Sequence, residues 1–155
     1  MKEIKLTQGK IALIDDEDYG YLNQFKWCAD KLGSTFYAKR RLYISIKEQY
    51  NIYMHRIIMN APKGMEVDHI DHNGLNNQKY NLRICTKCQN NRNKLPSGKS
   101  KYLGVSAEDI KYKAEIMINH NKIRIGRFTT EEAAARAYDK KAKEYFGEFA
   151  NLNFK

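Results

Sequence analysis

The spacing of apolar and polar residues predicts two short strands at the start of the chain. Residues 2–6 and 10–14 both alternate, and Gln8 and Gly9 lie between them. This pattern is typical of an antiparallel hairpin with a tight connection. Residues 35–43 show the same two-residue period, which predicts another strand.

Helical spacing follows the first hairpin. Tyr21, Leu22 and Phe25 fall on one side of a helix, and the acidic run 15–18 precedes them. Acidic side chains suit a helix start, whereas a calcium loop would need further ligands at fixed spacing. We therefore interpret residues 15–18 as the solvated start of a helix.

Alternation returns near the end of the chain. Residues 112–118 alternate, a turn is predicted at His120 and Asn121, and residues 122–128 alternate again. These features predict a second β-hairpin.

A helix is predicted directly after this hairpin. Thr129 and Glu132 have the spacing of a capping box, residues 131–146 are rich in alanine, and Gly147 suits a left-handed helix end. We expect a small three-stranded antiparallel sheet packed on one helix.

The composition limits the class of protein. The 155 residues are 42% hydrophobic and 30% charged, and the formal net charge is +10. The chain has no apolar run near the roughly 20 residues that span a bilayer, so we expect no membrane segment. Three cysteines are too few for a disulfide framework, which favours a reducing, cytoplasmic location. The positive charge predicts a polyanionic partner: nucleic acid first, and an anionic membrane surface as the weaker alternative.

Part of the charge is concentrated in the middle of the chain. No Asp or Glu occurs from His72 through Ala107. The same stretch carries seven basic residues: Lys79, Arg83, Lys87, Arg92, Lys94, Lys99 and Lys101. Residues 96–100 break all periodicity, so we predict a linker there between domains 1–95 and 101–155.

The same region contains residues suited to phosphodiester hydrolysis, which needs a base for water and a metal held by oxygen ligands. Asp68 and His69 are adjacent, so on a strand their side chains leave on opposite faces. Thr86 and Gln89 form a capping box that predicts a short helix with Asn90 in its first turn.

The run 55–93, with its Asp-His pair and central Asn-Leu-Arg, resembles the ββα-metal motif of HNH endonucleases from phages and introns. The resemblance implies that His69 is the general base and that Asn81 braces the loop and the base. It also implies that Asp68 and Asn90 bind one divalent ion, expected to be Mg²⁺. The motif core is expected at about residues 50–95, with the N-terminal segment wrapped around it.

Residues 101–155 resemble the DNA-binding domain of plant ethylene-response factors, the Apetala-two type. The matching segments are Tyr102-Leu103-Gly104-Val105, Gly126-Arg127-Phe128, 132–139 and 147–154. Glu108 and Tyr112 occupy a stretch where the plant domain has base-reading residues, so the resemblance implies the fold more directly than base recognition. The DNA contacts predicted for the whole chain are Lys79, Arg83, Lys87, Arg92, Lys94, Lys113, Lys122 and Arg124.

Two alternatives concern the same residues. His69 and His72 with Cys85 and Cys88 have zinc-like spacing, but HNH proteins with structural zinc carry two Cys-x-x-Cys pairs and this chain has one. Asp68 and His69 are also compatible with an ion pair in an inactive domain. We interpret His55, which lies beside packing residues, as structural.

The sequence thus predicts an α+β protein with a ββα-metal core and a C-terminal sheet-and-helix domain. Its predicted function is metal-dependent cleavage of double-stranded DNA by a phage or homing-type HNH endonuclease. The alternative is a DNA-binding regulator with a silent HNH core, and RNA is a less favoured substrate. We expect a monomer.

Overall fold

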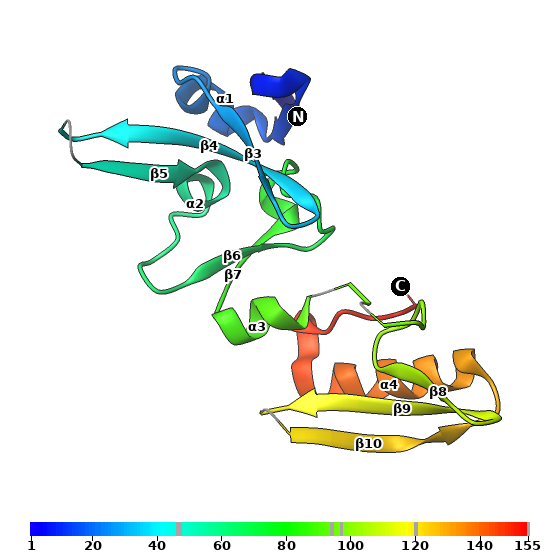
Figure 1. The fold of residues 1–155 in the computed structure, drawn as a ribbon. Helices are drawn as coiled ribbons and strands as arrows, with labels where there is room; N and C mark the ends of the chain where they lie inside the picture. Colours follow the sequence, from blue (N-terminus) through cyan, green and yellow to red (C-terminus); the bar gives the residue numbers. More distant parts are fainter. Residues whose placement is uncertain (46–47, 94, 97, 120, 155) are drawn as a thin grey trace. The chain divides into compact units, whose positions relative to one another are not determined.

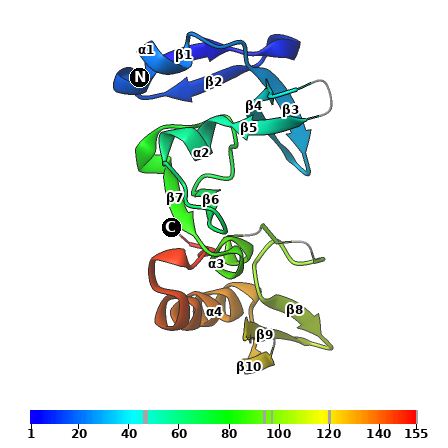
Figure 2. The ribbon, with the colours of Figure 1, turned by 90° about the vertical axis from the view of Figure 1, so that its left-hand side faces the viewer.

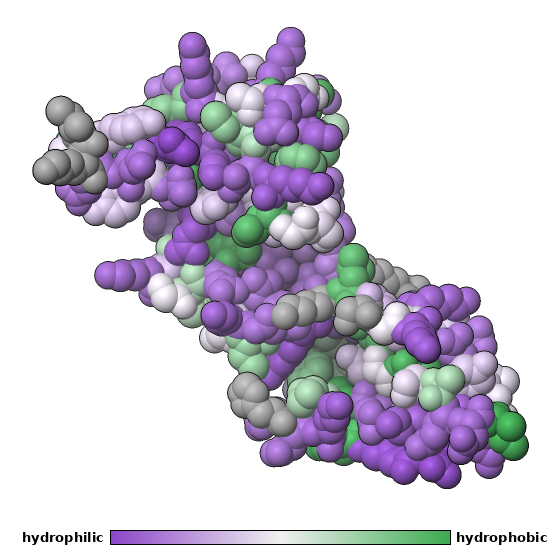
Figure 3. Space-filling view, viewed as in Figure 1, coloured by the Kyte–Doolittle hydropathy of each residue, from purple (hydrophilic) through white to green (hydrophobic). Residues whose placement is uncertain are grey.

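The computed structural model describes residues 1–45, 48–93, 95–96, 98–119 and 121–154, in two compact units, Met1–Asn90 and Asn91–Lys155 (Figure 1). Small antiparallel sheets and a few helices make up both units, which confirms the mixed α and β class. The predicted linker, 96–100, lies after the division between the units, and its residue 97 is outside the described residues. No helix in the described part of the chain is long and apolar enough to cross a membrane. Hydrophilic residues cover most of the face in Figure 3.

The first unit begins with the predicted hairpin. Strands β1 (Lys2–Lys5) and β2 (Ile11–Ile14) pair in antiparallel register, joined through the short 3-10 helix η1 (Thr7–Gly9). Helix α1 (Asp16–Leu22) follows (Figure 2). It has three acidic residues in its first turn, as the sequence predicts, but it ends before Phe25, which the predicted helical spacing included.

A three-stranded antiparallel sheet comes next, in the order β3 (Cys28–Leu32), β4 (Thr35–Tyr43) and β5 (Gln49–Tyr53). The predicted strand 35–43 is confirmed as β4. Helix α2 (Met54–Ile58) leaves the sheet directly after β5. The core of the first unit contains buried side chains from these segments: Ile4, Leu6, Ala12, Ile14, Leu22, Trp27, Ala29, Ala38 and Met54.

The last elements of the first unit are two paired strands and the beginning of a helix, which the division between the units crosses after Asn90. Strand β6 (Glu66–His69) pairs with β7 (Leu82–Cys85) in antiparallel register, and α3 (Lys87–Arg92) begins two residues later. The 3-10 helix η2 (Lys79–Asn81) ends the loop between the strands. This loop is fixed to β2, because Leu13 N donates to Leu75 O at 2.8 Å and Asn77 N to Leu13 O at 2.8 Å.

The second unit is an antiparallel sheet in the order β10-β9-β8, with helix α4 (Glu131–Phe146) packed on it. Its strands are β8 (Val105–Glu108), β9 (Lys111–Ile118) and β10 (Asn121–Phe128). This confirms the predicted three-stranded sheet, hairpin and helix, while His120 of the predicted turn lies outside the described residues. Gly147 ends α4 with a positive φ of 55° and begins the 3-10 helix η3 (Gly147–Phe149).

The predicted capping box at Thr129 and Glu132 is wrong by one residue. Thr130 is the N-cap, with extended backbone angles, and its Oγ1 accepts a hydrogen bond of 3.2 Å from Ala133 N. Because α4 begins at Glu131, only Thr130 has the half-in position that an N-cap requires. Because Thr129 and Thr130 are adjacent and both suit an N-cap, the sequence alone does not decide between them.

The corrected cap gives a first testable prediction. Thr130→Ala is expected to lower the free energy of unfolding by about 1 kcal/mol, because a backbone N–H at the helix start loses its acceptor. Thr129→Ala is the control and should cost less, which urea unfolding of both variants measures. An equal loss in the two variants would contradict the assignment of the cap.

Candidate active site

Strand β6 carries the adjacent residues Asp68 and His69. Both are 5% exposed, and in the ladder Asp68 lies opposite Arg83 while His69 lies opposite Leu82. Because alternate side chains leave a strand on opposite faces, the carboxylate and the imidazole point to different sides of the hairpin. Each side has its own set of contacts.

Arg83 occupies the carboxylate side. Its Nε and Nη2 lie 2.8 and 2.7 Å from Oδ2 of Asp68, and both side chains are largely buried. Charge-assisted bonds of this kind fix the orientation of a carboxylate. The structure therefore gives Arg83, a predicted DNA contact, a position beside Asp68.

Asn77 occupies the imidazole side. Its Nδ2 donates to Leu75 O at 3.1 Å, which turns its Oδ1 toward Nε2 of His69 at 3.4 Å. An oxygen acceptor at this place favours the tautomer with hydrogen on Nε2. The lone pair of the neutral imidazole then lies on Nδ1, the atom that could accept a proton.

A cluster of rings surrounds His69. The ring centroids of Tyr37 and His55 lie 5.6 and 5.1 Å from that of His69, and Tyr53 stacks on His55 at 5.6 Å. His55 is 8% exposed, and its Nδ1 has no hydrogen-bond partner among the described residues. The ring of His55 thus packs beside the predicted base, and its structural role stays a prediction.

Burial keeps both imidazoles uncharged. Desolvation lowers the pKa of His55 to about 3, aided by the interaction with the neighbouring His69 and by the charge of Arg56. Burial also lowers the pKa of His69, against the opposing effects of the Asn77 hydrogen bond and the Asp71 and Asp68 charges. At neutral pH His69 is therefore a neutral imidazole that can accept a proton.

Asn81 fixes the loop after β6. Its Nδ2 donates to Asp71 Oδ1 at 2.9 Å and to Asn76 O at 2.8 Å, and its Oδ1 accepts from Asp71 N at 3.0 Å. Asn76 Nδ2 adds a bond of 2.7 Å to Asp71 Oδ2. Burial alone would raise the pKa of Asp71, but bonds from Asn76, the Asn73 backbone and Asn81 together lower it. The side chain of Asn81 thus lies where a loop-bracing residue is predicted.

The same loop lies against β4 at Gly74. A Cβ at this position would meet Phe36 O at 2.5 Å and the ring of Tyr37 at 2.7 Å. Gly74 N also donates to Oγ1 of Thr35 at 3.0 Å. A residue without a side chain is therefore required for the loop to approach the sheet this closely.

Helix α3 brings Asn90 to β6. The predicted capping box is confirmed, since Thr86 N donates to Gln89 Oε1 at 2.8 Å and Gln89 N to Thr86 Oγ1 at 3.2 Å. Asn90 Nδ2 donates to Glu66 Oε2 at 2.6 Å. The Oδ1 atom is then the one through which this amide would bind a cation.

Glu66 is a site residue that the sequence analysis missed. It lies two positions before Asp68 on β6, so both carboxylates project from the same face of the strand. A cavity of about 300 Å³ joins these elements, lined by Leu32, Tyr37, Tyr53, His55, Arg56, Glu66, Val67 and Asn90. The two-residue period of a strand could have identified Glu66 from the sequence, because it places Glu66 on the same face as Asp68.

The donor set is compatible with a hard divalent cation. Asp68 offers carboxylate oxygens and Asn90 a carboxamide oxygen, the ligand types that Mg²⁺ prefers. Within the described ranges, no three His, Cys, Asp or Glu side chains gather as a metal cluster. A bound ion would therefore rely on Asp68, Asn90, water and the substrate.

Two comparisons with known proteins identify the family. Residues 53–92 match the family model described as HNH endonuclease. The chain is also 34% identical, over 148 residues, to an uncharacterized HNH endonuclease of Acanthamoeba polyphaga mimivirus. That alignment covers 94% of this chain and 76% of the relative. The chain belongs to the HNH endonuclease family. It is accordingly a nuclease.

The family match includes every site residue described so far on β6, β7 and α3 of this HNH nuclease. It also begins at Tyr53 and so includes His55. Sequence reasoning had assigned no role to Asn77, which was only one of several asparagines in a polar loop. Its contact with His69 depends on the path of the loop between β6 and β7, which a short sequence pattern does not predict.

The cysteines differ in their surroundings. Cys85 is buried, and desolvation together with the charges of Asp68 and Glu66 raises its pKa to about 11, so it is a neutral thiol. Cys88 is exposed. Among the described residues, these cysteines form no cluster with His69 and His72 that could hold a metal ion.

The basic residues predicted to contact DNA have varied surroundings. Lys79 contacts Glu17 and Asp18, Lys113 pairs with Glu115, and Arg124 pairs with Glu108. Lys87 and Lys122 are exposed, Arg92 lies 4.3 Å from the centre of the Phe146 ring, and Lys94 is outside the described residues. Contact of these residues with DNA stays a prediction.

Proposed function

We propose that this HNH nuclease is a metal-dependent endonuclease of the phage and homing type that hydrolyses phosphodiester bonds in duplex DNA. The observation that carries the proposal is the buried, uncharged His69, with Nε2 directed at Asn77 and with Asp68 next to it on β6. The hairpin and the following helix would form the ββα-metal core that the sequence predicts.

His69 would act as the general base. Its Nδ1 takes a proton from a water molecule, whose oxygen attacks phosphorus as the bond to the 3′ oxygen breaks. The departing 3′ oxygen takes a proton from solvent water, so the products would carry a 5′-phosphate and a 3′-hydroxyl. Asn77 holds the tautomer and Asn81 holds the loop that carries Asn77, so both are positioning residues.

Asp68 and Asn90 would hold one divalent ion, in our proposal Mg²⁺. When bound, the ion would neutralise charge on the phosphate and on the departing oxygen. Arg83 orients the carboxylate of Asp68, and Glu66 orients the amide of Asn90. Arg83 and Glu66 are therefore positioning residues that hold the two ion ligands in place.

The second unit would position DNA, as its resemblance to ethylene-response-factor domains implies. Arg124 and Lys113 lie on β10 and β9, directly opposite Glu115 and Arg127 in the ladder. On this face Glu108 contacts both Arg124 and Arg127, so DNA phosphates would have to compete with this carboxylate for the two guanidinium groups.

Incubation of plasmid DNA with the full chain tests the proposed function. We expect nicked or linear products with MgCl₂ and none with EDTA. If the protein binds the plasmid but does not cleave it with any divalent ion, the result would instead support a DNA-binding regulator with a silent core. Single-stranded RNA serves as the comparison substrate.

A second testable prediction concerns Asn77. Asn77→Leu is expected to slow cleavage by roughly 10–100-fold with little change in DNA affinity, because Nε2 of His69 loses its acceptor. Asn77→Asp, which keeps an oxygen toward Nε2, should retain more activity than Asn77→Leu. Single-turnover rates measure both, and thermal melting confirms folding. Wild-type cleavage by folded Asn77→Leu would refute the role given to Asn77.

A further inference from the structure

One row of side chains on β4 connects the candidate active site with the exposed end of the sheet. Tyr37, Lys39, Arg41 and Tyr43 alternate along β4 and so project from one face, here called the outer row. At one end, the ring of Tyr37 lies 5.6 Å from that of His69. At the other end, Tyr43 is 66% exposed.

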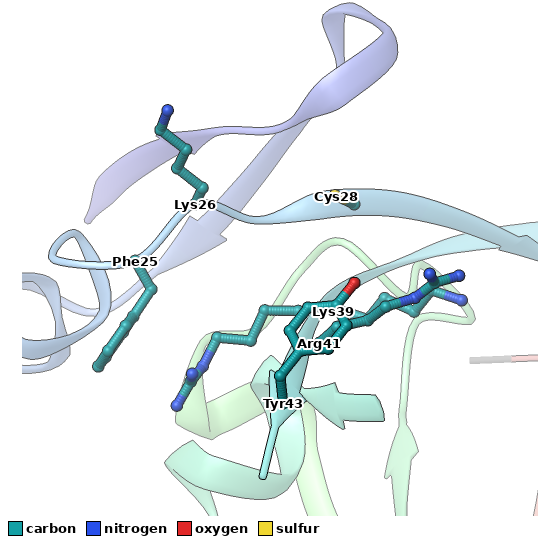
Figure 4. A pocket seen from close by; sticks show the side chains of 7 residues that line it. Phe25, Lys26, Cys28, Lys39, Arg41 and Tyr43 are labelled. Atoms are coloured by element: carbon teal, nitrogen blue, oxygen red, sulfur yellow. The ribbon is translucent and has the colours of Figure 1, made fainter. Parts of the chain in front are cut away.

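The outer row borders a basic cavity. This cavity of about 470 Å³ is lined by Phe25, Lys26, Cys28, Lys39, Arg40, Arg41 and Tyr43. Its lining contains four cationic side chains and no acidic one. Figure 4 shows Lys39, Arg41 and Tyr43 together on β4, with Phe25 across from them on the chain that leads into β3.

The cations of the cavity differ in how they are balanced. Lys39 pairs with Asp30 at 2.7 Å, whereas Arg41 has no ion pair in the described part of the chain. Arg40 stacks on Phe25, its guanidinium 4.0 Å from the ring centre, and its buried Nε has no hydrogen-bond partner among those residues. The positive charge of Arg41 is therefore open to a ligand, and Arg40 adds to the local field.

The strand edge here is also open. In the described ladders β3 pairs with β4 only as far as Lys39, while β5 continues along β4 to Tyr43. On the outer face, Arg41 lies opposite Asn51 and Tyr43 opposite Gln49, which are uncharged. Among the described residues, the carboxylates that act on the outer row are at its other end: Asp30 pairs with Lys39, and the charge of Asp68 acts on Tyr37. The end at Arg41 and Tyr43 therefore offers donors and positive charge.

We propose that the outer row and its cavity bind the sugar-phosphate backbone of the DNA beside the scissile bond. This inference rests on the proposed function, because the same DNA would enter the active site. Arg41 would contact phosphate oxygens through its planar guanidinium, and Tyr43 would pack on the sugar. The row thus extends substrate binding from Tyr37 along β4.

The length of the outer row limits which part of the DNA it can contact and protect from hydroxyl radicals. The six residue-to-residue steps of the strand from Tyr37 to Tyr43 span about 20 Å at 3.3 Å per step. Duplex DNA rises about 3.4 Å per base pair, so the contacts should lie within about six base pairs of the cut and on one side of it.

DNA affinity of the full chain tests the proposal. Fluorescence anisotropy with duplex DNA is measured in EDTA, so that binding is separated from cleavage. Arg41→Gln should weaken binding several-fold and reduce the slope of log K against log salt by about 1. Adding Lys39→Gln to this variant should reduce the slope by much less, because Lys39 already pairs with Asp30. Arg41→Lys should restore most of the slope.

Lys31→Gln is the matched control. Lys31 is an exposed cation of the same sheet without an ion pair in the described residues, and it lies opposite Phe36, on the other face. Removing its charge should change the salt slope by much less. Hydroxyl-radical footprints should show that Arg41→Gln loses protection on one flank of the cut, which Lys31→Gln keeps.

The outcomes separate this inference from the proposed function. If the wild type cleaves DNA and Arg41→Gln matches Lys31→Gln in slope and footprint, the outer row does not bind DNA and the nuclease proposal stands. The same result would leave the row open to an acidic protein segment. If the wild type binds DNA with the expected slopes and does not cleave it, the outer row is supported and the proposed function fails.

Discussion

Replacing His69 by alanine is expected to slow DNA cleavage by about 10²–10⁴-fold, the usual loss when a positioned general base is removed. Asp68, Asn90 and the basic surfaces remain in this variant, so DNA affinity should stay close to that of the wild type. Single-turnover cleavage with Mg²⁺ measures the rate, and anisotropy in EDTA measures the affinity.

His55→Ala is the informative comparison for His69→Ala. Both substitutions remove a buried imidazole from the same ring cluster, but only His69 has the Nε2 contact with Asn77. His55→Ala should lower the melting temperature and reduce cleavage less than His69→Ala does. If His69→Ala cuts at the wild-type rate, or if the two variants lose activity equally with equal losses of stability, His69 is not the base.

The repeated patterns were the most predictable part of this chain. Strand β4 and helix α4 have the predicted bounds, because long alternating or helical runs report which side chains face a core. Strands β3 and β5 were not predicted. Each is five residues long and largely exposed, so neither has enough buried positions to show a period.

The site was predictable where residues are neighbours in sequence. Asp68 and His69 are adjacent, and the capping box of Thr86 and Gln89 predicts the helix that carries Asn90. The partners that orient these groups come from farther away, such as Arg83 across the ladder and Asn77 through the returning loop. Their roles depend on register and loop path, which a residue pattern does not encode.

The ion pair of Asp68 and Arg83 complicates any test of the metal site, because Asp68 serves two purposes in the proposal. Its side chain is 6% exposed and that of Arg83 15%, so loss of one partner costs stability as well as chemistry. Asp68→Ala is expected to lower the free energy of unfolding by about 3–5 kcal/mol. It should also reduce cleavage by about 10³-fold or more, because ion binding contributes several kcal/mol to the transition state.

A double variant separates these two effects. Asp68→Ala with Arg83→Met removes both charges and replaces the ion pair by apolar contacts, which often restores stability. The melting temperature of the double variant should then approach that of the wild type, while its cleavage rate should stay as low as that of Asp68→Ala. In Asp68→Asn, which keeps one oxygen for the ion, high Mg²⁺ concentrations should recover part of the activity. If the double variant regains cleavage along with stability, Asp68 acts only as the partner of Arg83, and the ion is held elsewhere.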